Sequence, residues 1–274
     1  VALIEELTAI PAPSNHEQAR AAFVRDWLLA RGATGVVIDE ALNVVLPMGA
    51  DAPDGCTLFL AHIDTVFPDL DPLPVKREGD RLYGPGVGDD TTNVAAMMLW
   101  TQYILEHRLT HRQGVIIAFN SGEEGLGNLK GVRQLMQTYG KQVKRVYAFD
   151  GGTRFVVNSA VGSGRWKVTV TTQGGHSYSK FGSPNAIARL SDIVCALYAL
   201  ETPRDQSRTT YNVGVIEGGT SINTIAQKAH MLYEIRSNRK ASLEQMQAAF
   251  EGVIASFQSR GYEIEVELLG LRPC

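Results

Sequence analysis

Apolar and polar positions alternate over the first 150 residues in a pattern of strands and helices. Short apolar runs rich in β-branched residues are typical of buried strands, and longer stretches with apolar positions three and four apart are typical of helices. Strands are predicted near residues 36–39, 42–46, 57–61, 114–119 and 145–149. Helices are predicted near residues 16–31, 92–106 and 128–139. Because strands and helices alternate, we expect an α/β fold with a partly parallel sheet flanked by helices.

The pattern changes after Gly162-Ser163-Gly164. Beyond these glycines, strands are predicted at 166–171, 210–216, 229–235 and 264–268, with helices at 185–200 and 242–258. The resulting order, βαββαβ, is the ferredoxin-like arrangement. We therefore predict two domains, 1–161 and 162–274, with the glycines as the hinge between them.

Composition and charge then exclude several classes of protein. A hydrophobic content of 44% and a charged content of 20% are typical of a soluble globular protein. The net charge of -3 does not favour binding to nucleic acid or to an anionic membrane. No apolar run approaches the ~18 residues of a membrane span, and the first residues lack the basic region of a signal peptide. Cys56, Cys195 and Cys274 are widely spaced, as expected for reduced thiols in a cytoplasmic protein.

Acidic and imidazole side chains follow three of the predicted strands. In open α/β sheets, ligands bind outside the carboxyl ends of the strands. The residues at these ends are His62 and Asp64, then Glu123 and Glu124, then Asp150. Each of them alone is typical of a turn or a helix cap. One imidazole and four carboxylates at three strand ends instead indicate a catalytic or metal site.

The spacing of these residues favours metal chemistry. His62 and Asp64 lie two apart on extended chain and point the same way, so one can bind a metal while the other orients it. Adjacent carboxylates repel each other unless they share a cation or a proton. The glycine-rich stretch Gly84–Asp90 precedes a helix, and its acids are either helix caps or metal ligands. The glycines imply a constrained backbone that aims one carboxylate, and we favour Asp89 as that ligand. A carboxylate has two oxygens and can bridge two cations about 3.5–4 Å apart.

These segments resemble the family of co-catalytic zinc exopeptidases and amidohydrolases. That family includes carboxypeptidase G, aminoacylase, peptidase T and succinyl-diaminopimelate desuccinylase. The matching stretches are His62–Val66, Gly84–Asp90, Ser121–Gly125, the turn at Asp150, Gly174–Ser177 and Gly182–Ile187. The resemblance covers essentially the whole chain and leans towards the peptidase-T side. It implies a zinc-exopeptidase-type mixed sheet, an inserted ferredoxin-like dimerisation (lid) domain, and a homodimer formed through residues 162–274.

The resemblance also implies a set of metal ligands. Asp89 would bridge two zinc ions, with His62 and Asp150 as further ligands of one ion. Glu124 would bind the other ion, and Asp64 would steady His62. Carboxylate and imidazole ligands suit zinc, and cobalt or manganese would be accepted by the same ligand types.

The implied reaction is hydrolysis of an amide bond in a small peptide or an N-acyl amino acid. Glu123 would be the general base that takes a proton from a metal-activated water and passes it to the leaving nitrogen. His176 would reach the active site of the partner subunit and stabilise the oxyanion. Asn223 and Arg236 would contact the substrate, although a surface arginine at a strand end is an equally good interpretation of Arg236.

The sequence departs from the family pattern in two places. Thr91-Thr92 stands where the family usually has Lys-Gly, so a customary cation near the site is lost. The chain stops at Cys274, just after the inserted domain, whereas the family returns to supply its last metal ligand, a histidine on the Glu124 metal. Either the sequence is a fragment or the second metal site is incomplete. The alternatives are therefore a deacylase of the acetylornithine type, or a non-catalytic, ligand-binding or inactive relative.

Overall fold

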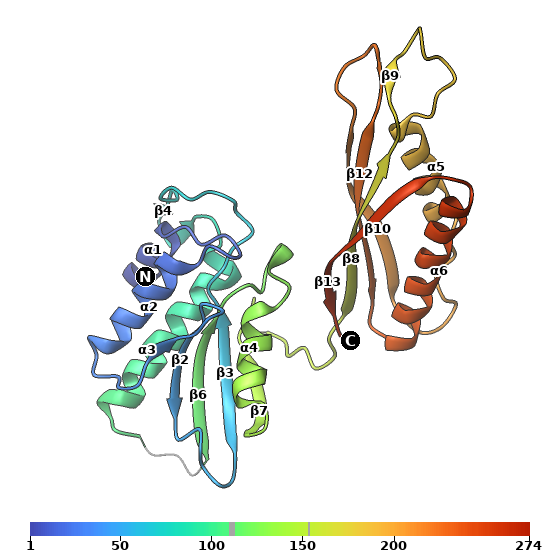
Figure 1. Ribbon diagram of the computed structural model, residues 1–274. Helices are drawn as coiled ribbons and strands as arrows, with labels where there is room; N and C mark the ends of the chain where they lie inside the picture. The colour runs from blue at the N-terminus through green and yellow to red at the C-terminus, as the bar shows by residue number, and fades with distance from the viewer. Residues whose placement is uncertain (110–112, 153) are drawn as a thin grey trace. The chain divides into compact units, whose positions relative to one another are not determined.

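The computed structural model describes residues 1–109, 113–152 and 154–274, apart from the side chain of residue 126. The chain forms two compact units, Val1–Phe155 and Val156–Cys274 (Figure 1). The hydrophobic pattern placed this boundary slightly later, at the glycines of 162–164. Within the described part of the chain, every helix is too short or too polar to span a lipid bilayer.

The first unit has a five-stranded mixed sheet with the strand order β1-β2-β6-β3-β7. Its strands are β1 (Val37–Ile38), β2 (Val44–Met48), β3 (Cys56–His62), β6 (Gly114–Asn120) and β7 (Val143–Ala148). Strand β3 pairs in parallel with both β6 and β7, whereas β2 pairs antiparallel to β1 and β6. The predicted α/β class and the partly parallel sheet are confirmed.

Helices cover both faces of this sheet (Figure 1). They are α1 (Ala2–Ala9), α2 (Gln18–Leu29), α3 (Thr92–Glu106) and α4 (Lys130–Tyr139). Leu28 of α2 and Met98 of α3 belong to one core cluster, which includes Phe119 of β6. Leu135 of α4 packs in a second cluster with Leu58 of β3. Because successive strand residues point to opposite faces, β3 and β6 bury both of their faces, which explains their continuous apolar runs.

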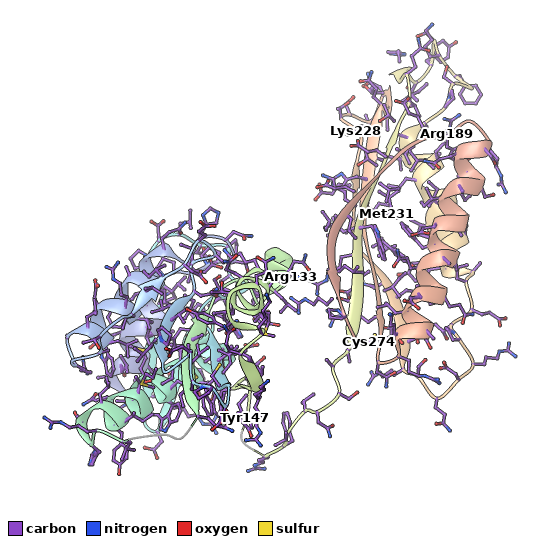
Figure 2. All side chains as sticks on the ribbon, turned by 60° about the horizontal axis from the view of Figure 1, so that its bottom comes forward. Arg133, Tyr147, Arg189, Lys228, Met231 and Cys274 are labelled. Atoms are coloured by element: carbon purple, nitrogen blue, oxygen red, sulfur yellow. The ribbon has the colours of Figure 1, made fainter. Side chains whose placement is uncertain are left out.

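Several short elements of the first unit were not predicted from the hydrophobic pattern. They are the hairpin of β4 (Lys76–Glu78) and β5 (Arg81–Tyr83), the irregular turn η1 (Val87–Thr91) and the 3-10 turn η2 (Gly125–Gly127). Strand β7, predicted near 145–149, lies at the edge of the sheet, and its Val146 and Tyr147 are about half exposed. Tyr147 is labelled in Figure 2. The hairpin and the two turns are too short or too polar to leave a hydrophobic period.

The second unit is the predicted ferredoxin-like βαββαβ fold. Its strands are β8 (Gly162–Thr171), β10 (Thr209–Gly218), β12 (Lys228–Ser237) and β13 (Glu263–Arg272), in the antiparallel order β10-β12-β8-β13. Helices α5 (Ala186–Tyr198) and α6 (Lys240–Ser259) pack on one face (Figure 1). Met231 of β12 points into the core between sheet and helices (Figure 2). Two short strands, β9 (Gly175–His176) and β11 (Thr224–Ile225), pair with each other outside the main sheet.

Candidate metal centre

The carboxyl ends of β3 and β6 open into the same space. The two strands pair in parallel, with His62 directly opposite Asn120. The chain that follows β3 and the chain that follows β6 therefore continue side by side beyond the sheet. The amide of Ile63 donates a hydrogen bond to the carbonyl of Asn120 (2.8 Å) and prolongs the pairing past the end of β3. This is the edge of the sheet at which open α/β folds bind their ligands.

Three residues in this space have the geometry of a metal-binding group. His62, Asp89 and Glu124 each offer one ligand atom, and the three atoms lie within 4.8 Å of one another. His62 Nε2 lies 3.0 Å from Asp89 Oδ1. One imidazole and two carboxylates are donors that suit zinc, manganese or cobalt. The residues present therefore fit a divalent cation.

His62 is held so that one ring nitrogen faces this group. Its Nδ1 lies 3.1 Å from the carbonyl oxygen of Asp64 and 3.4 Å from Asp64 Oδ1, which leaves Nε2 for Asp89. Burial alone would lower the pKa of His62, but the hydrogen bond with Asp64 and the charges of Asp90, Asp64 and Glu123 raise the pKa to about 10. The field of the surrounding carboxylates thus favours a positive charge at this point, which either a proton or a metal cation supplies.

Asp64 also anchors the backbone of the acid pair. Its Oδ1 accepts a hydrogen bond from the amide of Glu123 (2.9 Å), and its Oδ2 accepts one from the amide of Glu124 (2.9 Å). The hydroxyl of Ser14 donates to the same Oδ2 (2.7 Å). Burial would raise the pKa of Asp64, but its hydrogen bonds with His62, Ser14 and the Glu123 amide bring the pKa below its ordinary value. The role expected for Asp64 was to steady His62; the contacts add the positioning of both glutamates.

Glu123 and Glu124 are more exposed than Asp64, which anchors their backbone. Both glutamate side chains are half-buried. Burial and the nearby charge of Asp89 raise the pKa of Glu124 to about 7, and the charges of Glu123 and Asp64 add to this. Like charges in close proximity disfavour ionisation, and a cation placed among them removes that penalty. The charge of Glu123 is thus one contribution to the raised pKa of Glu124, smaller than burial and the charge of Asp89.

A tight turn presents Asp89. Gly86 adopts the left-handed conformation (φ 68°), and a Cβ atom there would lie 2.5 Å from Thr65 Cγ2. Only glycine therefore fits at this position. The peptide bond between Asp89 and Asp90 is cis. The Asp89 side chain remains largely exposed, on the side of His62.

The neighbouring Asp90 has a structural role. It is fully buried, its Oδ2 accepts a hydrogen bond from the amide of His62 (3.0 Å), and its Oδ1 accepts one from Asn93 Nδ2 (2.6 Å). Burial raises the pKa of Asp90 to about 7. Helix α3 starts at Thr92, as predicted, but Thr91 makes no side-chain capping hydrogen bond. The two aspartates therefore differ in role: Asp89 belongs to the metal-binding group, and Asp90 ties the turn to β3.

Asp150 is not part of this three-residue group among the described residues. It is exposed in the turn after β7, and the adjacent carbonyl of Gly151 accepts a hydrogen bond from Asn93 Nδ2 (3.3 Å). Its charge contributes to the raised pKa of Asp90, so it is near the site. The three-residue group consists of His62, Asp89 and Glu124 without it. The assignment of Asp150 as a metal ligand stays a prediction.

Four residues that support the site were not predicted from the sequence. They are Ser14, Glu17, Asn93 and Lys130. The spacing of Ser14 and Glu17 ahead of an apolar helix is typical of a capping box. This pattern is what could have drawn attention to the two residues. The structure uses both side chains differently, because Ser14 reaches Asp64 and Glu17 reaches Gly122. No local pattern marks Asn93 or Lys130.

In the second unit, two of the predicted site residues lie next to each other. Strands β9 and β11 pair with His176 opposite Thr224, and the amide of Ser177 donates to the carbonyl of Asn223 (2.9 Å). His176 and Asn223 are both exposed. The amide of Tyr178 donates a hydrogen bond to His176 Nδ1 (3.3 Å). The pairing of two short strands thus presents an imidazole and an amide at one exposed tip.

Arg236 lies at the other end of the same unit. Its Nε donates to Glu234 Oε1 (2.7 Å) and its Nη2 to Glu234 Oε2 (3.1 Å). Lys228, next to β11, and Arg236 lie at opposite ends of β12, and the rise of ~3.4 Å per strand residue separates them by roughly 27 Å. Within one unit, Arg236 therefore does not join His176 and Asn223. The assignments of all three residues stay predictions.

Comparison with known proteins extends this picture. A model of "Peptidase family M28" matches residues 43–182, and one of a "Peptidase dimerisation domain" matches residues 158–261. The chain is 27% identical over 239 residues to the protein YqjE of Bacillus subtilis, covering 83% of this chain and 62% of that protein. It is 26% identical over 263 residues to succinyl-diaminopimelate desuccinylase of Nitrosococcus oceani, covering 89% and 69% respectively. The chain thus spans about two thirds of the length of these relatives.

A solved structure of a tripeptidase from Staphylococcus aureus has the same fold. It superposes with a TM-score of 0.70 over 98% of this chain and 74% of the tripeptidase chain, at 22% identity. At this identity the likeness shows the fold alone. Together, these similarities extend over both units of the chain.

Proposed function

This chain belongs to the family of co-catalytic zinc exopeptidases and amidohydrolases, and we propose that it is a metal-dependent hydrolase of amide bonds. Members of the family hydrolyse peptide bonds or the bonds of acylated amino acids. The observation that supports the proposal here is the convergence of His62, Asp89 and Glu124, with Glu123 alongside, at the carboxyl ends of two parallel strands. The substrate we propose is a small peptide or an N-acyl amino acid.

The family uses divalent metal ions, and the donors present fit one. His62, Asp89 and Glu124 would hold the metal, and we propose zinc as its identity. If two ions bind, Asp89 and Asp150 would join His62 and Glu124 in holding them. A bound divalent cation supplies Lewis acidity, which polarises a carbonyl group and makes water more acidic. Asp64 keeps the His62 ring oriented, which such a ligand requires.

Glu123 is the proposed general base. Its backbone is fixed by the hydrogen bond to Asp64 Oδ1, next to the backbone of the proposed ligand Glu124. From there it would take a proton from the attacking water and pass it to the leaving nitrogen. Glu123 as base and Glu124 as ligand would have different roles. We propose this difference as the reason why two acidic residues stand next to each other.

Residues of the second unit would complete the site from a partner copy. His176 and Asn223 lie together at an exposed tip, and this region falls within the matched peptidase dimerisation domain. We propose a homodimer formed through this unit, in which His176 stabilises the oxyanion and Asn223 contacts the substrate. Arg236 would bind a substrate carboxylate, since a guanidinium can contact a carboxylate with two parallel hydrogen bonds. A cytoplasmic location also stays a prediction.

The substrate panel follows from the relatives. One relative is described as a desuccinylase and one structural neighbour as a tripeptidase. Tripeptides, dipeptides, N-succinyl amino acids and N-acetylornithine therefore cover the candidate amide classes. The full chain would be loaded with Zn²⁺, its metal content measured by mass spectrometry, and release of free amine followed for each substrate.

The expected result is stoichiometric metal and turnover of at least one of these amides. A chain that binds no divalent metal contradicts the proposal outright. Bound metal without turnover of any member of the panel would instead support the non-catalytic alternative. Turnover confined to N-acetylornithine would support the deacylase.

A further inference from the structure

Three consecutive amides of the turn that holds the acid pair donate to buried carboxylates. The amides of Glu123 and Glu124 donate to the two oxygens of Asp64, and the amide before them, that of Gly122, donates to Glu17 Oε1 (3.0 Å). Asp64 already belongs to the candidate site. Glu17 lies 105 residues away from Gly122 in the sequence and has no role in the proposed reaction.

We propose that Glu17, paired with Lys130, is a positioning residue of this turn, which presets Glu124 for the metal and Glu123 for the attacking water. This inference rests on the proposed function, because it assigns a purpose to a contact only if the acid pair binds a metal. It adds to the site two residues that touch neither substrate nor metal.

Both carboxylate oxygens of Glu17 accept hydrogen bonds. The side chain is completely buried. Its Oε1 accepts hydrogen bonds from the amides of Asn15 (2.9 Å) and Gly122 (3.0 Å), and its Oε2 accepts one from Lys130 Nζ (2.9 Å). A buried carboxylate is costly unless it is both paired and hydrogen-bonded, and Glu17 is both. A buried group so fully satisfied specifies one geometry for the loops that it joins.

Lys130 stands where helix electrostatics disfavour it. It is the first residue of α4, and a positive charge at a helix N-terminus opposes the helix dipole. Its ammonium group compensates by pairing with Glu17 (2.9 Å). The pair is neutral, so Glu17 can hold the turn without adding a further negative charge behind Glu123 and Glu124.

The stem of Lys130 also packs against the turn. Gly122 has the left-handed conformation (φ 60°), and a Cβ atom there would lie 2.5 Å from Lys130 Cγ. The glycine therefore permits two things at once: the backbone bend that aims its amide at Glu17, and the close approach of the lysine chain. The Gly122 turn, Glu17 and Lys130 form one interlocked unit beneath the acid pair.

Binding of Co²⁺ to the full chain tests this assignment without requiring turnover. Cobalt accepts the same donors as zinc, and its visible absorption reports the ligand geometry. We expect Glu17→Ala to weaken Co²⁺ binding roughly 10- to 100-fold, the usual effect of losing a residue that supports a ligand. Its spectrum at saturation should also differ from that of the unaltered chain. Glu17→Gln keeps an acceptor oxygen for the Gly122 amide and should restore most of the affinity.

A double-mutant cycle addresses the ion pair. Lys130→Met leaves the Glu17 charge buried and unpaired, and it should weaken Co²⁺ binding. Adding Glu17→Gln to Lys130→Met removes that charge, so the double variant should bind Co²⁺ more tightly than Lys130→Met alone. No such recovery would contradict the role of the pair.

A matched control separates positioning from general destabilisation. Leu28→Ala opens a cavity in the completely buried part of α2, the helix that follows Glu17. It should lower the melting temperature while leaving the Co²⁺ affinity and spectrum unchanged. Glu17→Ala with unaltered affinity and spectrum would overturn the inference, as would equal losses in Glu17→Ala and Leu28→Ala. Failure of the unaltered chain to bind Co²⁺ overturns the proposed function and this inference with it.

Discussion

The two units hold their candidate residues in opposite ways. In Val1–Phe155, His62 and Asp64 are 3% and 0% exposed, and each is fixed by hydrogen bonds to another part of the chain. In Val156–Cys274, His176 and Asn223 lie exposed at a tip of two short strands. Burial strengthens electrostatic interactions and fixes side chains, whereas water screens exposed ones. The first unit therefore has a prearranged site, and the second has residues whose proposed chemistry depends on a surface outside that unit.

Strand topology produces this difference. Parallel pairing of β3 and β6 brings the ends of two strands to one edge, so His62 and the acid pair converge. In the antiparallel sheet of the second unit, the chain leaves alternate strands at opposite ends. Arg236 and His176 are separated for this reason. Candidate catalytic side chains thus come together where the strands pair in parallel.

The largest effect is expected in the first unit, for Glu123→Gln. Glutamine cannot accept the proton, so turnover should fall about 10²- to 10⁴-fold. The backbone amide at this position still reaches Asp64, so bound metal should be unchanged. Turnover and metal content are measured on the same sample, with Glu6→Gln on the exposed side of α1 as the control. Loss of metal would mean that the base and the ligand have been assigned the wrong way round.

His176→Ala tests whether the exposed tip of the second unit has a catalytic role. Removing one oxyanion donor typically lowers kcat about 10²- to 10³-fold. Because the side chain is exposed, the free energy of unfolding should change by no more than about 0.5 kcal/mol. Kinetics, thermal unfolding and light scattering would be measured together. A dimer with full activity after this substitution would refute the proposed role and sharpen the contrast between the units.

Asp64→Asn asks how much the buried anchor of the first unit contributes. The amide group replaces one acceptor oxygen with a donor that faces the backbone of the acid pair, and it removes the charge beside His62. Metal affinity should fall roughly 10- to 100-fold, and stability by about 1–3 kcal/mol. Calorimetric titration with Zn²⁺ and denaturant unfolding measure the two effects.

The matched control for Asp64→Asn is Asp205→Asn in the second unit. Asp205 is an exposed residue. It accepts hydrogen bonds from the Ser207 amide and the Ser242 hydroxyl (2.7 Å each). Its substitution should leave metal affinity unchanged. Equal losses of affinity in the two variants would show that the effect does not come from the anchor.

The smallest effect is expected for Tyr233→Phe in the core of the second unit. The Tyr233 hydroxyl is buried and has no hydrogen-bond partner among the described residues, while its ring stacks on Phe250 at 5.2 Å. Removing an unpaired buried hydroxyl should stabilise the chain by about 1 kcal/mol. Tyr211→Phe is the control, because Tyr211 donates to the carbonyl of Leu200 (3.0 Å) and should lose stability instead. A lower melting temperature for Tyr233→Phe would contradict this account.

Much of the fold was predictable from short-range pattern. The helix expected at 92–106 is α3 with the same bounds, and the two-domain change of pattern matches the change from a mixed to an antiparallel sheet. Such elements follow from hydrophobic period, which depends on neighbours along the chain. The hairpin of β4 and β5 was missed because its strands are three residues long and mostly exposed.

The candidate site likewise has a part that the sequence indicated and a part that it did not. Its candidate residues could be proposed from the sequence because His62, Asp64, Glu123 and Glu124 lie at or just beyond the ends of recognisable strands. Its supports could not, because Ser14 and Glu17 contact residues 50 and 105 positions away. Asp89 was chosen over Asp90 from the sequence, and the structure adds that Asp89 lies against His62 Nε2 whereas Asp90 is buried.

The sequence by itself determined which elements form, which family the chain resembles and which side chains are available for metal chemistry. These properties depend on residue type and local spacing. Only the tertiary structure decided which carboxylates meet, which are buried, and that Asp64 and Glu17 hold the acid pair from beneath. Those outcomes depend on contacts between segments distant in sequence, where burial and hydrogen bonding give each identical carboxylate its own environment.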